Sequence, residues 1–414
     1  MTQAGKQLAR ARLDCLCRIV TDGTHDSPKL QQSGIPFVKG KHISGGFVDL
    51  ENCDHITKED HEKAIQRSKP ERGDILFSNI GSVGDAAFIS IDKAFSIKNV
   101  ALFKPDPDVV DSKYLYYVVL GPKFRGELFA KRSGVAQPFF SLEMLRSHEV
   151  EYHHDLTIQK KIASILSTYD DLIENNLRRI KILEKMAQAL YREWFVKFRF
   201  PGHEKVRIVD SPLGKIPEGW EVKKLLELAD VTYGFAFKSK QFNTEGNGKP
   251  VVRIRDVLAG VSDTYSPEEA GSKYIVENGD ILVGMDGEFH MGFWVGGNAY
   301  LVQRVARFRS KVDIGRYHLF LALHEPIQHF NVTITGTTVA HLGHEHIKTI
   351  EIVWPKNEAR VKVNRFLEPL LGQVLNLRLK NQTLRRTRDL LLPKLISGEL
   401  DVSDLDIDVT EEAA

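Results

Sequence analysis

Two long stretches, residues 157–195 and 358–397, constrain the fold more than any other feature. In both, mostly apolar residues recur at alternating steps of four and three, which predicts long helices packed along a common seam. The first seam is Ile162, Leu166, Tyr169, Ile173, Asn176, Ile180, Leu183, Ala187, Leu190 and Trp194. The second is Val363, Leu367, Leu370, Val374, Leu377, Asn381, Leu384, Arg388, Leu391 and Leu395, with Pro369, Gly372 and Pro393 inside the stretch as possible bends. The alternative is two unrelated amphipathic surface helices.

Each seam contains one asparagine, and this predicts how the helices pair. If they lie antiparallel with seam ends matched, Asn176 meets Asn381, and the end positions pair as Ile162 with Leu395 and Trp194 with Val363. Two facing amides satisfy each other, whereas a slip in register leaves an amide unpaired among apolar side chains at a cost of about 1 to 3 kcal/mol. We therefore expect the asparagine pair to fix the register.

Composition limits what these helices can be attached to. A chain of 414 residues with 42% hydrophobic residues is expected to form two or three domains, and no apolar run approaches 18 residues. Three cysteines without zinc-ligand spacing, and an N-terminus without a secretion signal, predict a cytoplasmic protein. Residues 399–414 hold seven acids and no base, so the net charge of +2 leaves +9 on the rest (57 minus 48). A basic body with an acidic tail is compatible with nucleic-acid binding.

The two halves of the sequence are copies of each other. Gly-Asp-Ile-Leu at residues 73–76 recurs at 279–282, an offset of 206. Further echoes, at an offset of 202, link 133–134 and 144–150 with 335–336 and 346–352. Short strands are expected at 35–43, 74–78, 86–91 and 100–103, and again at 251–254, 280–283, 293–295 and 305–308. The order is therefore globule, helix, globule, helix.

These observations divide the chain into six parts. Proline and glycine punctuate residues 198–220, which are typical of a linker. The predicted parts are a first globule at 1–155, a central helix at 156–197, the linker at 198–220, a second globule at 221–356, a C-terminal helix at 357–398 and an acidic tail at 399–414. The predicted fold class is α+β: two similar, mostly β domains joined by two long antiparallel helices, with an internal pseudo-twofold repeat.

Several long strings resemble the specificity subunit of type I restriction-modification systems. They are Ile-Glu-Asn-Asn-Leu at 173–177, residues 187–195, Ser-Pro-Leu-Gly-Lys-Ile-Pro-Glu-Gly-Trp at 211–220, and residues 390–400. The resemblance covers nearly the whole chain. One departure is that the usual double proline before each long helix is replaced by His153-His154 and by the single Pro355.

The resemblance implies that each globule is a target-recognition domain reading one half of a bipartite, asymmetric site in double-stranded DNA. The helices would act as a ruler, since 39 residues span roughly 58 Å, and as a dock for two methyltransferase subunits and for motor-nuclease subunits. It also implies a non-catalytic chain without a cofactor: S-adenosylmethionine belongs to the methyltransferase, and ATP and magnesium to the motor-nuclease. The alternative is a free-standing DNA-binding or scaffold protein that acts without a methyltransferase.

Enzymatic and metal-binding functions are the other possibilities for this sequence. Neither the Asn/Asp-Pro-Pro-Tyr/Phe motif of an amino-methyltransferase nor a phosphate-binding loop is present. Asp210 with Glu221 and Lys223 imitates a nuclease set but follows a linker, which favours chance. His290, His341, His344 and His346 raise the possibility of a metal site. The first half has no equivalent histidines, so a polar DNA-facing loop is favoured and no metal is expected.

Candidate DNA-reading residues were chosen as polar side chains beside glycine turns and as neighbouring Lys or Arg. In the first globule they are Thr24, His25, Lys39, Lys41, Ser78, Asn79, Ser82, Lys98, Arg132 and Gln137. In the second they are Tyr233, Lys238, Lys240, Arg253, Arg255, Asp286, Arg304, Thr337 and Thr338. For each of them the alternative is an ordinary solvated surface residue.

Overall fold

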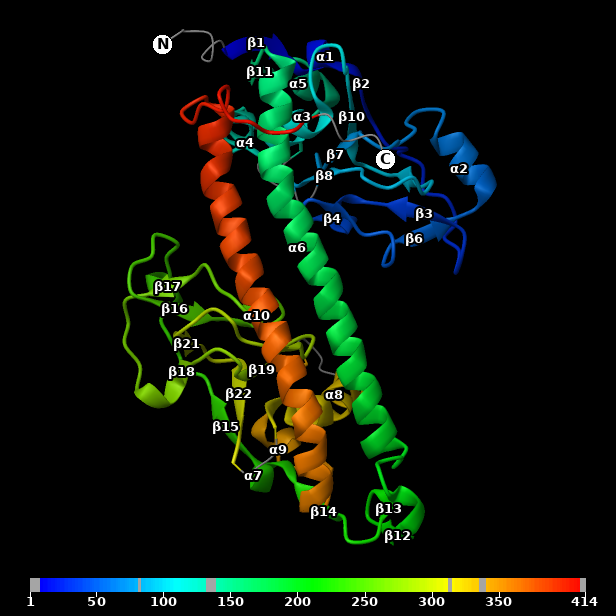
Figure 1. The fold of residues 1–414 in the computed structure, drawn as a ribbon, viewed down its shortest axis with the longest axis vertical. Helices are drawn as coiled ribbons and strands as arrows, with labels where there is room; N and C mark the ends of the chain where they lie inside the picture. The colour runs from blue at the N-terminus through cyan, green and yellow to red at the C-terminus, as the bar shows by residue number, and fades with distance from the viewer. Residues whose placement is uncertain (1–7, 81–82, 132–138, 312–314, 335–339, 410–414) are drawn as a thin grey trace. The chain divides into compact units, whose positions relative to one another are not determined.

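The computed structural model describes the chain except for residues 1–7, 81–82, 132–138, 312–314, 335–339 and 410–414 (Figure 1). It divides into two compact units: unit 1 is Met1–Ile173 with Thr383–Ala414, and unit 2 is Glu174–Gln382. The long helices are α6 (Leu156–Tyr191), which continues as a π-helix (Arg192–Val196), and α10 (Asn357–Ile396). The predicted helices therefore exist, and each unit contains one globule and part of both. Among the described residues, no helix is long and apolar enough to cross a membrane.

Unit 1 contains the first head, our name for the globule of residues 1–155. Its main sheet has the order β2 (Cys17–Asp22), β10 (Ala101–Pro105), β7 (Ile75–Phe77), β8 (Ala86–Phe88), all antiparallel. Smaller sheets are β6 (Asp54–Ile56), β3 (Ile35–Val38), β9 (Ser96–Ile97); β1 (Leu8–Arg12) with β11 (Glu149–His153); and β4 (Ile43–Ser44) with β5 (Phe47–Val48). The helices are α1 (Leu13–Leu16), α2 (Lys58–Ala64), α3 (Ser112–Leu120), α4 (Pro122–Ala130), α5 (Leu142–Arg146) and the 3-10 turn η2 (Gly40–His42).

Unit 2 contains the second head, residues 221–356, which repeats this topology. Its main sheet has the order β15 (Ala229–Tyr233), β22 (Val305–Ser310), β19 (Ile281–Gly284), β20 (Met291–Phe293). The second sheet has the order β17 (Tyr265–Ser266), β16 (Lys249–Val252), β21 (Ala299–Leu301), β18 (Ile275–Val276). Two further sheets have two strands each: β14 (Glu221–Lys224) with β23 (Glu351–Trp354), and β12 (Ile208–Ser211) with β13 (Gly214–Pro217), which precedes the head. The helices are α7 (Leu225–Leu228), α8 (Arg316–Thr333), α9 (His344–Ile347) and the 3-10 turns η4 (His203–Lys205), η5 (Ser239–Gln241), η6 (Ile254–Asp256) and η7 (Ser272–Tyr274).

The turn before β7 and its counterpart before β19 show why the repeated motif was visible in the sequence. Gly73 and Gly279 adopt φ of 91° and 87°, a left-handed conformation that favours glycine. The next residue caps the turn in each copy: Asp74 Oδ2 accepts the backbone N–H of Glu71 at 2.8 Å, and Asp280 Oδ2 accepts that of Glu277 at 2.8 Å. The α+β fold class with an internal repeat is confirmed. The strand predicted at 293–295 is displaced, because β20 ends at Phe293.

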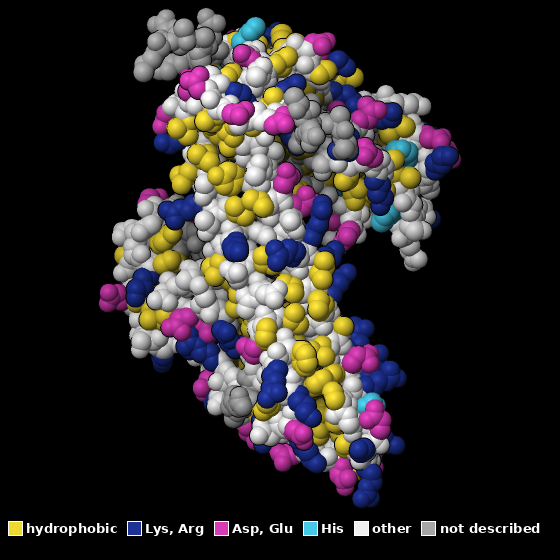
Figure 2. Space-filling view, viewed as in Figure 1, with side chains coloured by type: hydrophobic (Ala, Val, Ile, Leu, Met, Phe, Trp, Pro, Cys, Tyr) yellow, Lys and Arg dark blue, Asp and Glu magenta, His cyan; other side chains and the backbone are white. Residues whose placement is uncertain are grey.

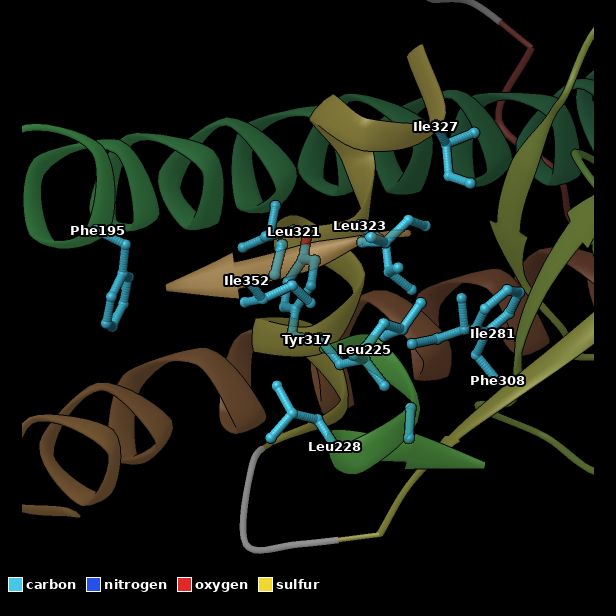
Figure 3. Close-up of a cluster of buried hydrophobic side chains, with 14 of the residues drawn as sticks. Phe195, Leu225, Leu228, Ile281, Phe308, Tyr317, Leu321, Leu323, Ile327 and Ile352 are labelled. Atoms are coloured by element: carbon cyan, nitrogen blue, oxygen red, sulfur yellow. The ribbon is translucent and has the colours of Figure 1, made fainter. Parts of the chain in front are cut away.

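Each head packs its core against both long helices of its own unit. In unit 1, buried Ile162 and Leu166 of α6 and Leu392 and Leu395 of α10 belong to the core of the first head. The core of unit 2 is drawn in Figure 3, where side chains from α7, α8, the main sheet, β23 and the end of α6 converge: Phe195, Leu225, Leu228, Ile281, Phe308, Tyr317, Leu321, Leu323, Ile327 and Ile352. The head is thereby attached to the helix pair through buried apolar surface, which is the main favourable contribution to its folding.

The helix pair is antiparallel in each unit. In unit 2, Asn176 Nδ2 donates to Asn381 Oδ1 at 2.8 Å, and one turn or two away Arg378 Nη2 lies 3.0 Å from Glu184 Oε1. In unit 1, Arg388 pairs with Asp170. The expected approach of the two amides is therefore present, and their role in fixing register stays a prediction.

The second seam departs from strict heptads near its prolines. Leu371 is fully buried, while Leu370, the residue expected in the seam, is only partly buried. From Val363, the buried positions Leu367, Leu371 and Val374 follow at steps of four, four and three, so they span 11 residues in three turns rather than the seven residues in two turns of a heptad. Pro369, Gly372 and Pro393 do not end α10.

Candidate nucleic-acid interface

A close approach of two backbone segments builds the same loop pair in both heads. A Cβ at Gly23, just after β2, would lie 2.2 Å from the carbonyl oxygen of Ile97, and a Cβ at Gly234, just after β15, would lie 2.1 Å from that of Val302. Only glycine fits such a distance. The backbone N–H of Gly23 donates to Val100 O at 2.9 Å, and that of Gly234 donates to Val305 O at 3.1 Å. The loop after the first strand is thus held beside the loop before β10 or β22.

In the first head this arrangement assembles the first loop cluster, which we define as Asp22, His25, Arg67, Lys98 and Asn99. The buried Asp22 carboxylate accepts Arg67 Nε at 2.9 Å and lies 3.2 Å from His25 Nε2. The other ring nitrogen, His25 Nδ1, lies 3.2 Å from Asn99 Oδ1. Lys98 pairs with Ser27. His25 and Lys98 were predicted; Asp22, Arg67 and Asn99 were missed.

The remaining candidates of the first head differ in exposure. Lys41 is exposed, and Lys39 Nζ lies 2.6 Å from Asp54 Oδ2, a hydrogen bond that lowers the pKa of the Asp54 carboxyl. Thr24 is nearly buried, and its Oγ1 accepts the backbone N–H of Asp26 at 3.1 Å. This hydroxyl stabilises the loop rather than presenting a free group to solvent.

Ser78 and Asn79 are enclosed by the fold, and their predicted role in reading DNA stays a prediction. Both lie just after β7 and are buried, at 0% and 3% exposure. Asn79 Nδ2 donates to Phe140 O at 3.1 Å, so the segment just before α5 lies against this loop. A side chain enclosed in this way cannot reach a base edge without local unfolding, and sequence pattern alone does not report such covering.

In the second head the equivalent loops form the second loop cluster, defined as Tyr233, Asp286, Arg304, His341 and His344. Asp286 Oδ1 lies 2.6 Å from His341 Nδ1 and 3.2 Å from Arg304 Nη1. The hydroxyl oxygen of Tyr233 lies 3.0 Å from His344 Nδ1. Burial raises the pKa of this hydroxyl. Arg304 and His341 are about half exposed, so this network of donors and acceptors faces solvent. It joins three predicted residues to two histidines considered for metal binding.

Three other candidates of the second head surround the second sheet. Arg253 pairs with Thr264 and lies over the Phe242 ring, 5.8 Å from its centroid. Arg255 is exposed and lies 3.4 Å from Asp263 Oδ1. Lys238 is exposed at the start of η5, and only its backbone N–H donates to Glu268, at 3.0 Å. Arg253 is therefore engaged in the fold, whereas Arg255 and Lys238 are accessible.

Lys240 is exposed on η5. Ser82, Arg132, Gln137, Thr337 and Thr338 lie outside the described residues, and their predicted role stays a prediction.

The histidines of the second head have separate partners. His346 Nδ1 accepts the backbone N–H of Gly343 at 3.0 Å, and His290 lies beside Glu288 at 3.8 Å. Within the part of the chain that the structure describes, no group of three or more His, Cys, Asp or Glu side chains is arranged to hold a metal ion. The arrangement offers directional hydrogen-bond donors and acceptors, the chemistry that reads base edges.

Comparison with known proteins links this architecture to one family. The family model described as the type I restriction modification DNA specificity domain matches residues 12–185 and 217–385. The type I restriction enzyme MjaIX specificity subunit of Methanocaldococcus jannaschii is 27% identical over 395 residues, covering 89% of this chain and 90% of that protein. The type I restriction enzyme EcoBI specificity subunit of Escherichia coli is 32% identical over 196 residues, covering 46% of this chain and 41% of that protein.

A solved structure shares the fold. The crystal structure of the type-I restriction-modification system S subunit from M. genitalium matches with a TM-score of 0.56 at 17% identity, and the match covers 96% of this chain and 98% of that one.

Proposed function

The chain belongs to the family of type I restriction modification DNA specificity domains, and from this premise we propose that it reads a two-part, asymmetric DNA target with one half-site for each head. It is a non-catalytic specificity subunit, as its relatives are named. S-adenosylmethionine would then be bound by a methyltransferase partner, and ATP and magnesium by a motor-nuclease partner, all in the cytoplasm.

The single observation that carries this proposal is the pair of loop clusters. Both include a loop pair held by the same backbone contacts, yet the side chains gathered there differ: the first cluster centres on the buried Asp22, and the second on the partly exposed Asp286, which follows β19. Equivalent scaffolds with different donors and acceptors suit the reading of two different half-sites. A two-headed reader with identical clusters would instead favour a symmetric target.

The long helices are proposed as the ruler and the dock. Helices α6 and α10 each run from one unit into the other, so their length sets how much chain separates the heads. Hydrophobic side chains remain exposed along them on the face in Figure 2. Of the hydrophobic side chains on the two helices, Ile182 and Met186 on α6 and Phe366 and Leu390 on α10 are each exposed by more than half. Apolar side chains that gather on an exposed surface are typical of sites that bind another protein, and we propose that two methyltransferase subunits bind here.

Selection from a duplex library tests the reading function. The purified full-length chain would be bound to duplexes carrying two randomised blocks with gaps of varied length, and the retained duplexes sequenced. We expect two short blocks of different sequence with one preferred gap. Retention of a single block, or of no sequence at all, contradicts the proposal.

Matched insertions test the ruler. Seven residues, one heptad, would be inserted after Ile173 in α6 and after Gln382 in α10, which adds about 10 Å and keeps the seam in phase. We expect unchanged half-sites and a preferred gap longer by about three base pairs, at roughly 3.4 Å each. Two-residue insertions at the same points are the control, since they rotate the seam by about 200° and should destroy folding. An unchanged gap in the heptad variant contradicts the ruler.

A further inference from the structure

Arg304 has a backbone conformation that side chains rarely adopt. It lies in the turn just before β22 with φ of +73°. The hydrogen bonds from Gly23 to Val100 and from Gly234 to Val305 align the two heads, so the corresponding residue of the first head is Asn99, with φ of +54°. Asparagine tolerates this region because its short amide bonds locally, whereas arginine gains nothing there. Strain of this kind is retained where function requires a particular side chain.

The Arg304 guanidinium is held from one side only. Nη1 lies 3.2 Å from Asp286 Oδ1, and the same oxygen lies 2.6 Å from His341 Nδ1, which fixes the carboxylate in turn. The side chain is 54% exposed, and its Nε and Nη2 make no hydrogen bond to the described residues. One edge of the planar group is thus anchored, and the Nε–Nη2 edge keeps two parallel donors.

That edge matches one partner in DNA. Two parallel N–H donors pair with O6 and N7 of guanine in the major groove, the commonest specific arginine contact. A phosphate partner is disfavoured because the Asp286 carboxylate, beside the guanidinium, repels a second anion. Anchoring by Asp286 also reduces the conformational entropy that arginine would lose on binding.

We propose that Arg304 is a specificity-determining residue of the second head, which reads a guanine by donating Nε–H and Nη2–H to its O6 and N7. The assignment rests on the proposed function and deepens it, because it names the base and the groove edge. Asp286 and His341 are positioning residues that act through Arg304.

The test compares Arg304→Lys, which keeps the charge without the planar fork, and Arg304→Gly, which suits the left-handed turn. The matched control is Arg207→Ala, an exposed arginine 3.6 Å from the carboxylate of Glu218 in the linker. Full-length proteins would be bound to the selected target and to duplexes in which each guanine is replaced singly by adenine or by 7-deazaguanine, which lacks the N7 acceptor.

For the wild-type chain and Arg207→Ala, we expect one guanine of one half-site whose replacement weakens binding by roughly 5- to 100-fold. Both Arg304 variants should bind the original and replaced duplexes equally, and Arg304→Gly should fold. Undiminished guanine discrimination in these variants overturns the assignment, and so does an equal loss on every duplex, which indicates a phosphate contact. A wild-type chain with no sequence preference would instead overturn the proposed function itself.

Discussion

The two heads share a backbone and differ in the side chains displayed on it. The contacts that build the loop pair join main-chain atoms, such as Gly23 N–H to Val100 O and Gly234 N–H to Val305 O, and need only glycine at one position. The side chains that follow are free to change: Asn99 in one head and Arg304 in the other occupy corresponding turns. The difference shows how a duplicated fold can acquire two specificities without altering its scaffold.

The two units also differ in how they join head and helices. In unit 1, Asp170 of α6 pairs with Arg388 of α10 and accepts the Tyr117 hydroxyl of α3 at 2.6 Å, so one carboxylate links all three elements. In unit 2, the corresponding cross-link is the more exposed pair of Glu184 and Arg378. The first is the more buried network and the second is closer to a surface ion pair, so we expect mutation to affect them differently.

The largest expected effect is the loss of the buried network. Asp170→Ala removes the acceptor of the Tyr117 hydroxyl and leaves Arg388 with only the exposed carboxylate of Asp389, so it should cost about 3 kcal/mol of unfolding free energy. Glu184→Ala should cost about 1 kcal/mol or less, because that pair is partly solvated. Denaturant unfolding of both variants measures the difference. Equal losses would show that the two cross-links are equivalent.

The next largest effect should come from the amide pair of Asn176 and Asn381 in unit 2. Asn176→Leu removes the donor to Asn381 Oδ1, which is buried, and should cost about 1 to 3 kcal/mol. The double variant with Asn381→Leu should recover most of this loss, because two leucines pack without an unsatisfied amide. If the double variant is as unstable as the single one, the pair contributes to stability itself, which contradicts a role limited to fixing the register.

Part of the acid sensitivity of the second head should come from one buried histidine. His318 of α8 is fully buried against Phe195, and burial, reinforced by the charge of Arg360, lowers its pKa to about 3. In the unfolded chain this histidine takes up a proton near pH 6.5, whereas in the folded chain it stays neutral down to about pH 3. Its protonation therefore costs no unfolding free energy above pH 6.5, and the unfolding free energy falls as the pH drops toward 3.

The loss due to His318 at pH 5.5 should be about 1 to 2 kcal/mol relative to pH 7.5. His318→Phe should remove it. The corresponding residue of α3, three positions after the helix cap, is Tyr114, and Tyr114→Phe serves as the control that leaves the pH dependence unchanged. Unfolding at the two pH values measures both, and undiminished acid sensitivity in His318→Phe would exclude this histidine as its source.

The smallest effect concerns the exposed lysines, where the heads should behave alike. Lys41→Ala and Lys240→Ala should each weaken binding a few-fold on every duplex and reduce the slope of log affinity against log salt by about one. Titrations at several salt concentrations measure this. A change in base preference for either variant would mean that the lysine reads sequence.

Local pattern explains what the sequence predicted well. The long helices and the repeat follow from periodicity and from turns such as Gly73-Asp74, which act within a few residues. Asp22 and Arg67 were missed because they meet only when α2 folds against the sheet. The burial of Asn79 could not be foreseen, because its partner Phe140 is distant in sequence. Asn99 and Arg304 had a usable signal, since each directly precedes a valine, Val100 just before β10 and Val305 at the start of β22.

Exchange of one head tests the central claim most directly. Residues 1–155 would be replaced by the matching segment of the MjaIX relative, and the chimera and both parents selected on the same library of two-block duplexes. If each head reads its own half-site, the chimera should keep the block read by the second head and adopt the relative's block for the first. Loss or alteration of both blocks in a folded chimera would contradict independent reading by the two heads.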